Sequence, residues 1–185
     1  MSISQYSLVL SVLVLLLGTA TLVSIVLFFT SAHWRSKMQT VAYETWMKLI
    51  GILATIATLG ALTYQFIYLT PVCLDCWWQR IFMFPIEMIV LVSLLTKNKL
   101  NHFLTWFMAS IGILFSIDHY SEHFERYVMG NATLVPCSPT PGEPLCGLAP
   151  TVTFGFITIP FMALMVFAVI IWLSYLAFHR SRQSE

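Results

Sequence analysis

The chain contains five apolar stretches that are each long enough, or nearly so, to cross a lipid bilayer as an α-helix. A membrane-spanning helix needs about 20 mostly apolar residues, because the hydrocarbon core is roughly 30 Å thick and the helix rises about 1.5 Å per residue. The stretches cover residues 6–30, 47–69, 77–95, 103–117 and 152–178. The fourth is the shortest and needs residues from its flanks. The sequence therefore predicts an all-α integral membrane protein with five spans.

Composition excludes a soluble globular domain. Only 9% of the residues are charged and 58% are hydrophobic, whereas soluble domains carry about a quarter charged residues. The nine Lys and Arg residues fall in short clusters between apolar runs, so no basic surface indicates nucleic acid as a partner.

The positions of these basic residues predict the orientation of the spans. Short cytoplasmic connections are rich in Lys and Arg. With five spans, three basic segments fall on one side: Arg35, Lys37 and Lys48; Lys97 and Lys99; Arg180 and Arg182. Arg126 is the exception, and Glu122 and Glu125 offset it. We expect an N-out, C-in topology in a cell membrane, with every cysteine on the extracytoplasmic side.

The first span is expected to be retained and not cleaved as a signal peptide. It has no basic n-region, and its apolar stretch exceeds the usual 7–15 residues. Cleavage would also place Cys73 and Cys76 in the cytoplasm, against the basic-residue bias. Residues 31–46 are predicted to form a cytoplasmic loop. Residues 118–151 are predicted to form a long, proline-rich outer loop, with one short surface helix over residues 119–129.

Four cysteines, at positions 73, 76, 137 and 146, read as two pairs, although the sequence alone does not fix which pairs form. Cys73 and Cys76 form a CxxC motif where the second span ends and the third begins. A thiolate at a helix N-terminus is stabilised by backbone N–H groups, so this pair is expected to be reactive. Cys137 and Cys146 lie in the proline-rich loop, where an exposed disulfide is exchangeable.

Two structural interpretations of the four cysteines compete with a redox relay, in which the two pairs pass electrons between them. Zinc sites usually combine two closely spaced pairs, which the spacing of Cys137 and Cys146 does not match, so we predict no metal. Purely structural disulfides remain an alternative, but a CxxC loop closes little chain and stabilises little.

Arg80 follows Cys76 by four residues and lies on the same helix face, one turn deeper. A cation inside a span is costly and is usually paired or functional. Its guanidinium could snorkel to the headgroups, or it could hydrogen-bond a quinone carbonyl. Gln79 offers another donor, and Trp77 is either an interface anchor or a wall of the same pocket. Glu87 lies deeper, near the same face.

The run from Cys73 to Pro85, CLDCWWQRIFMFP, resembles the DsbB family, especially the Gram-positive branch called BdbC. The later run GFITIPF at 155–161 resembles it too. The resemblance covers roughly residues 46–178. It implies a DsbB-like four-helix transmembrane bundle over residues 46–180 with an outer redox loop at 118–151, plus one extra N-terminal transmembrane helix and loop over residues 1–45. Asp75 departs from the family pattern and should raise the pKa of the neighbouring thiols.

The resemblance also implies an activity, that of a protein-dithiol:quinone oxidoreductase. A DsbA/BdbD-like thioredoxin-fold oxidase outside the membrane would attack the outer disulfide at Cys137, and Cys146 would then exchange with Cys73. Cys76 would pass the electrons to a quinone, menaquinone or ubiquinone, held beside Arg80, Gln79 and Trp77.

Three alternatives are weighed against this function. A vitamin K epoxide reductase relative usually carries its CxxC late in the chain, whereas here the CxxC comes first. A membrane scaffold would keep its disulfides inert. A transporter would be expected to have more intramembrane charges than Arg80 and Glu87, and a pair of discontinuous helices.

Overall fold

The computed structural model describes residues 1–96, 101–130 and 149–182, and this part of the chain is built from six α-helices. Five of them, all except α2, are long and apolar enough to cross a membrane, which confirms the predicted all-α membrane fold. The helices are α1 (Ile3–Thr30), α2 (Ala32–Thr40), α3 (Tyr43–Phe66), α4 (Leu74–Thr96), α5 (Asn101–Tyr127) and α6 (Ile159–Arg182).

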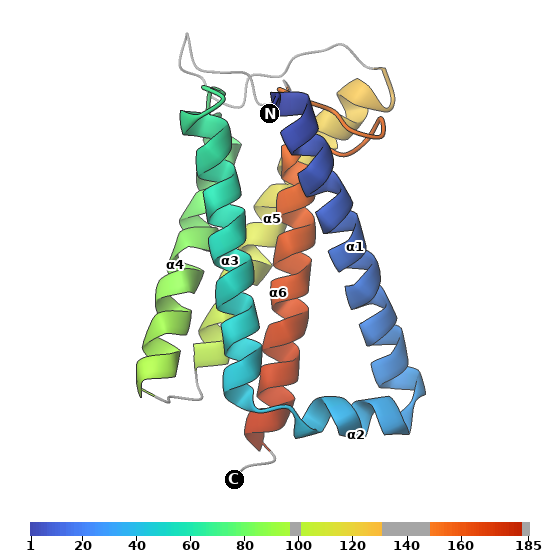
Figure 1. Cartoon of the computed structure of the whole chain (residues 1–185), viewed down its shortest axis with the longest axis vertical. Helices are drawn as coiled ribbons and strands as arrows, with labels where there is room; N and C mark the ends of the chain where they lie inside the picture. Colours follow the sequence, from blue (N-terminus) through green and yellow to red (C-terminus); the bar gives the residue numbers. More distant parts are fainter. Residues whose placement is uncertain (97–100, 131–148, 183–185) are drawn as a thin grey trace.

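The long helices stand side by side, and the N-terminus and the last turn of α6 lie at opposite ends of the bundle (Figure 1). The short helix α2 lies across the end at which α6 finishes. The connection from α3 to α4, which contains Cys73, lies at the other end, together with the N-terminus. We call this the cysteine end. The N-terminus and the end of α6 on opposite sides of the bundle agree with an odd number of spans. The orientation of the bundle in the membrane stays a prediction.

Helix α6 is the central helix of the structure. Half of its apolar segment is buried inside the protein, against 17% for α1, and it packs against α1, α3 and α5. Helix α4 closes the bundle by packing against α3 and α5. The core contains Met47 and Ile50 from α3, Ile86 from α4 and Phe167 from α6, all fully buried. Hydroxyl groups also join the helices, as where Thr105 of α5 meets Ser174 of α6 at 2.9 Å.

The connecting segments differ from the sequence predictions. Residues 31–46 were predicted as a loop but contain α2, whose N-terminus is capped by the Ser31 hydroxyl accepting from the Trp34 backbone N–H at 3.3 Å. The separate surface helix predicted over residues 119–129 is wrong, because α5 continues to Tyr127 with His119 and His123 buried. The last span begins at Ile159, since Phe154 and Gly155 adopt positive φ angles in a tight turn that joins Thr153 to Ile157.

We expect Gly112→Ala to destabilise the bundle. A Cβ at Gly112 would lie 2.4 Å from the ring of the fully buried Phe167, so the ring or the helix would have to shift. Overpacking of this kind costs about 1–3 kcal/mol. A lowered melting temperature in detergent would report it. Gly60→Ala is the matched control, because its Cβ would make only ordinary contacts, at 3.7 Å or more, and its melting temperature should not fall. Equal melting temperatures for the two variants would contradict the packing described here.

Candidate redox site

The CxxC motif opens α4 at the cysteine end of the bundle. Cys73 directly precedes the helix, and its carbonyl accepts the Trp77 backbone N–H at 3.3 Å. Cys76 lies in the first helical turn. Both residues are free thiols; Cys73 is buried and Cys76 is half-buried. Their Sγ atoms lie 2.9 Å apart. The motif thus places two sulfur atoms in contact where backbone N–H groups stabilise negative charge.

Cys73 also contacts α5. Its Sγ lies 3.6 Å from Nε2 of His119, whose Nδ1 lies 3.2 Å from Nε2 of Gln79. The hydrogen bond with Cys76 lowers the pKa of Cys73 to about 4; burial opposes this shift, and the contact with His119 reinforces it. The sequence predicts that Asp75 raises the pKa of the neighbouring thiols. The net shift of the Cys73 pKa is downward, and its contacts with Cys76 and His119 cause it.

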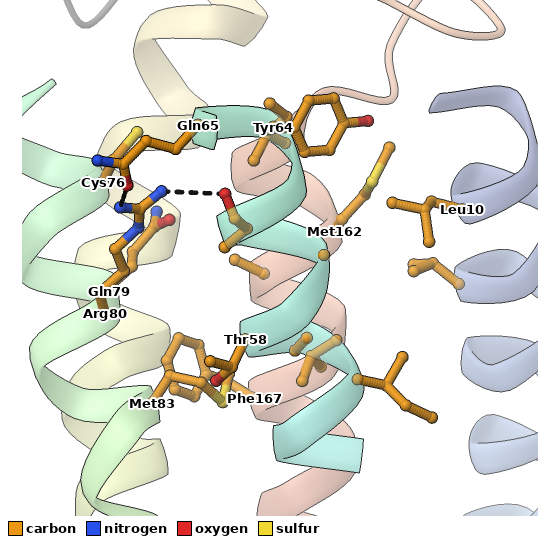
Figure 2. Close-up of a pocket in the computed structure, with 18 of the residues that line it drawn as sticks. Leu10, Thr58, Tyr64, Gln65, Cys76, Gln79, Arg80, Met83, Met162 and Phe167 are labelled. Atoms are coloured by element: carbon orange, nitrogen blue, oxygen red, sulfur yellow. Dashed lines mark hydrogen bonds between the residues drawn. The ribbon is translucent and has the colours of Figure 1, made fainter. Parts of the chain in front are cut away.

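Arg80 is buried at 9% exposure and points from α4 toward α3 (Figure 2). Its guanidinium donates one hydrogen bond to Oε1 of Gln65 and another, at 3.2 Å, to the carbonyl oxygen of Ala61. The group also lies 5.4 Å from the ring centroid of Trp77, within the range of a cation–π interaction. The cation is therefore paired inside the bundle, one helical turn below Cys76.

A cavity of about 390 Å³ lies beside these residues. Its polar lining includes Cys76, Gln79 and Arg80 from α4 and Gln65 from α3, and most of the remaining lining is apolar. Figure 2 shows these polar groups gathered on one side of α3. Trp77 does not line the cavity; its side chain is 48% exposed, and it touches the site through Arg80.

Three further residues singled out by the sequence are Cys137, Cys146 and Glu87. Cys137 and Cys146 fall outside the described residues. Glu87 accepts a hydrogen bond from the hydroxyl of Thr58, a residue that lines the cavity at mid-depth of α3.

The sulfur atoms of Cys73 and Cys76 and one ring nitrogen of His119 lie within 4.8 Å of one another. Such a set could hold a soft metal ion, although a closed structural zinc site needs four ligands.

Sequence reasoning missed His119 and Gln65. His119 falls in the predicted outer loop at 118–151, because the fourth apolar stretch ends at Ile117. Gln65 was not considered, although a polar side chain near the end of an apolar span is expected to face the bundle interior. Applied to both residues, that expectation indicates that their side chains face the bundle interior.

Comparison with known proteins agrees with the family resemblance of the run from Cys73 to Pro85. The family model described as "Disulfide bond formation protein DsbB" matches residues 43–177. The SPbeta prophage-derived disulfide bond formation protein B of Bacillus subtilis is 32% identical over 72% of this chain and 85% of its own length. Disulfide bond formation protein C of Bacillus subtilis is 36% identical over 70% of this chain and 86% of its own length. No solved structure matches. The matched residues begin at α3, so α1 and α2 lie outside the match.

We expect Cys73 to react as a thiolate across the neutral range. A pKa of about 4 leaves its thiol deprotonated, so its alkylation by iodoacetamide should be nearly independent of pH between about pH 6 and 8. His119→Leu removes a contact that lowers this pKa and should make the rate more pH-dependent, whereas His33→Leu on α2 should not. Mass spectrometry of the labelled peptide measures the rate. A rate that climbs about tenfold per pH unit toward an ordinary thiol pKa of about 8.5 would contradict the assignment.

Proposed function

The chain belongs to the DsbB family of disulfide bond formation proteins, and from this premise we propose that it is a quinone-reducing thiol oxidase. Its place in this family makes it a disulfide-forming oxidoreductase of the membrane. The finer proposal is that electrons pass from an extracytoplasmic thioredoxin-fold oxidase, through two cysteine pairs, to menaquinone or ubiquinone. The observation that carries it is that Cys76 and Arg80 line one cavity inside the helix bundle.

The cavity fits a membrane quinone in size and polarity. Its volume of about 390 Å³ lies within the range of small-molecule sites. A quinone combines a ring with two carbonyl acceptors and an apolar chain, and the lining offers hydrogen-bond donors from Arg80 and Gln79 beside apolar walls. When bound, the quinone supplies the capacity to accept two electrons and two protons.

The two thiols of the CxxC motif have different roles in this proposal. When the Cys73–Cys76 pair is oxidised, the Cys146 thiolate attacks Cys73 and releases Cys76, which faces the acceptor because its side chain lines the cavity. Together the two thiols lose two electrons and two protons and form one disulfide. His119 Nε2 lies 3.6 Å from Cys73 Sγ and is placed to hold the proton that Cys73 releases when it becomes a thiolate. Its other ring nitrogen contacts Gln79, which orients the imidazole.

Arg80 stabilises negative charge at the acceptor end of the relay. A guanidinium keeps its charge when buried and presents several donors in a fixed plane. Gln65 and the Ala61 carbonyl occupy part of that plane and hold it in position, and Trp77 flanks it. The remaining donors are available to an acceptor carbonyl in the cavity.

Cys137 and Cys146 form the outer pair of the relay. We propose that the thiolate of the reduced partner attacks Cys137 and that Cys146 then exchanges with Cys73. The partner is a DsbA/BdbD-like oxidase, and both pairs face outward from the plasma membrane. The distribution of Lys and Arg along the chain and the common end of Cys73 and the N-terminus support this orientation.

The direct test is quinone reduction by the purified protein, supplied with a reduced thioredoxin-fold oxidase. Wild type should turn over, and Cys76→Ser and Cys137→Ser should each abolish turnover, because each breaks one pair. Stopped-flow absorbance of the quinone measures the rate. No turnover with any donor or quinone, with the disulfides unreactive throughout, would leave a membrane protein with structural disulfides.

Arg80→Gln should raise the KM for quinone by roughly tenfold or more, because a hydrogen bond from a charged donor contributes about 1.5–3 kcal/mol. Arg35→Gln on α2, at the opposite end of the bundle, is the matched control and should leave KM unchanged. Melting temperatures of both variants separate a binding effect from unfolding. An unchanged KM in a folded Arg80→Gln protein would remove Arg80 from the site.

The partner step predicts a specific mixed disulfide. A thioredoxin-fold oxidase that lacks its resolving cysteine should become linked to Cys137, since no second partner thiol can release it. Mass spectrometry of the cross-linked peptides identifies the bond. Linkage at Cys146 or Cys73 would contradict the proposed order, in which the partner attacks Cys137 first.

A further inference from the structure

Helix α1 forms part of the wall of the cavity that holds Cys76 and Arg80, although it lies outside the family match. Four of its residues line the cavity, Leu10, Leu13, Val14 and Leu17. Their spacing places them on one face of the helix. In Figure 2, Leu10 lies on the opposite side of α3 from Arg80, with Met162 of α6 between them. The cavity therefore extends past α3 and is wider than the redox site itself.

The contacts of α1 hold this wall in place. Midway along α1, Gly18 allows a close approach to α6, because a Cβ there would lie 2.2 Å from the terminal methyl group of Met165. At the cysteine end, the Ser7 hydroxyl lies 2.6 Å from that of Tyr64 on α3 and 2.7 Å from that of Thr151. Helix α1 is thus held against α6 midway along its length, and against α3 and the segment before α6 near its N-terminal end.

The lining changes character from one end of the cavity to the other. Its charged group and its thiol come from α4, and its two glutamines come from α3 and α4. The residues contributed by α1 are all aliphatic, and those of α6 are all apolar. A cavity of this kind suits a ligand with a polar ring at one end and a long aliphatic chain at the other.

From this polarity we propose that α1 binds the isoprenoid chain of the quinone, in the part of the cavity that α1, α3 and α6 line. The inference rests on the proposed function, since it assigns the ring of the same molecule to the Cys76–Arg80 end. The extra helix thereby gives the redox site a binding wall that the matched residues 43–177 do not contain. A phospholipid acyl chain is the competing occupant.

Photolabelling tests the location without relying on activity. The probe is a quinone with a diazirine at the end of its isoprenoid chain, incubated with the full-length wild-type protein in lipid nanodiscs. We expect label on the Leu10–Leu17 segment that an excess of unlabelled quinone removes and an excess of phospholipid does not. Competable label on α3, α4 or α6 alone would overturn the proposal, as would label on α1 that only phospholipid removes.

Substitutions on α1 give a second test. Leu10→Trp and Leu17→Trp should raise the KM for a long-chain quinone about tenfold, which corresponds to ~1.4 kcal/mol, and should leave the KM for a chainless quinone unchanged. Leu8→Trp and Leu16→Trp are the matched controls, because these leucines are 46% and 61% exposed and do not line the cavity.

The outcomes separate the two proposals. If wild type reduces neither quinone, the proposed function fails. If wild type reduces both quinones and the lining variants behave like the controls, the function stands and the role of α1 is wrong. The wild-type photolabelling result decides the question if a tryptophan variant does not fold.

Discussion

A buried arginine sets the geometry on which the candidate site depends. Removing a guanidinium from water is costly inside a membrane bundle unless acceptors surround it. Helix α3 provides two acceptors, the Gln65 side chain and the Ala61 carbonyl. Arg80 lies one turn below Cys76, so the contacts that satisfy the cation also fix the first turns of α4 against α3. That arrangement places the Cys76 side chain at the cavity. The contacts that satisfy the charge of Arg80 are therefore the same contacts that position the Cys76 thiol.

The two cysteines of the motif are close together but have different surroundings. Cys73 precedes α4 and contacts α5 through His119, whereas Cys76 lies within the helix and lines the cavity. The lowered pKa of Cys73 follows first from its hydrogen bond with Cys76 and then from its contact with His119. The sulfur that is held as a thiolate contacts α5, whereas the other sulfur lines the cavity.

Much of this structure could be predicted from the sequence, and the exceptions share a physical reason. The five spans, the CxxC at a helix start and the position of Arg80 one turn below it follow from local periodicity. The partners of Arg80 and Cys73 do not, because Gln65 and His119 come from other helices and pair only after tertiary packing. His119 also lies in a polar segment that lowers local hydropathy, although its side chain is buried in the bundle. Helix α2 was missed because a short polar helix has no apolar pattern; its evident local signal is the Ser31 cap.

The manner in which α1 joins the bundle explains how a helix can be added without disturbing the core. Its buried positions include Ser7, Ser11 and Gly18, which fall on one side of the helix, while many of its large aliphatic residues stay exposed to lipid. Small and hydroxyl residues are what membrane helices use at their interfaces, since lipid offers no hydrophobic drive for association. Ser7 and Ser11 also bond to the hydroxyls of Thr151 and Thr153, in the segment just before α6. Thr151 follows Cys146 by only five residues in the sequence. The same helix therefore touches both the apolar end of the cavity and the segment just before α6.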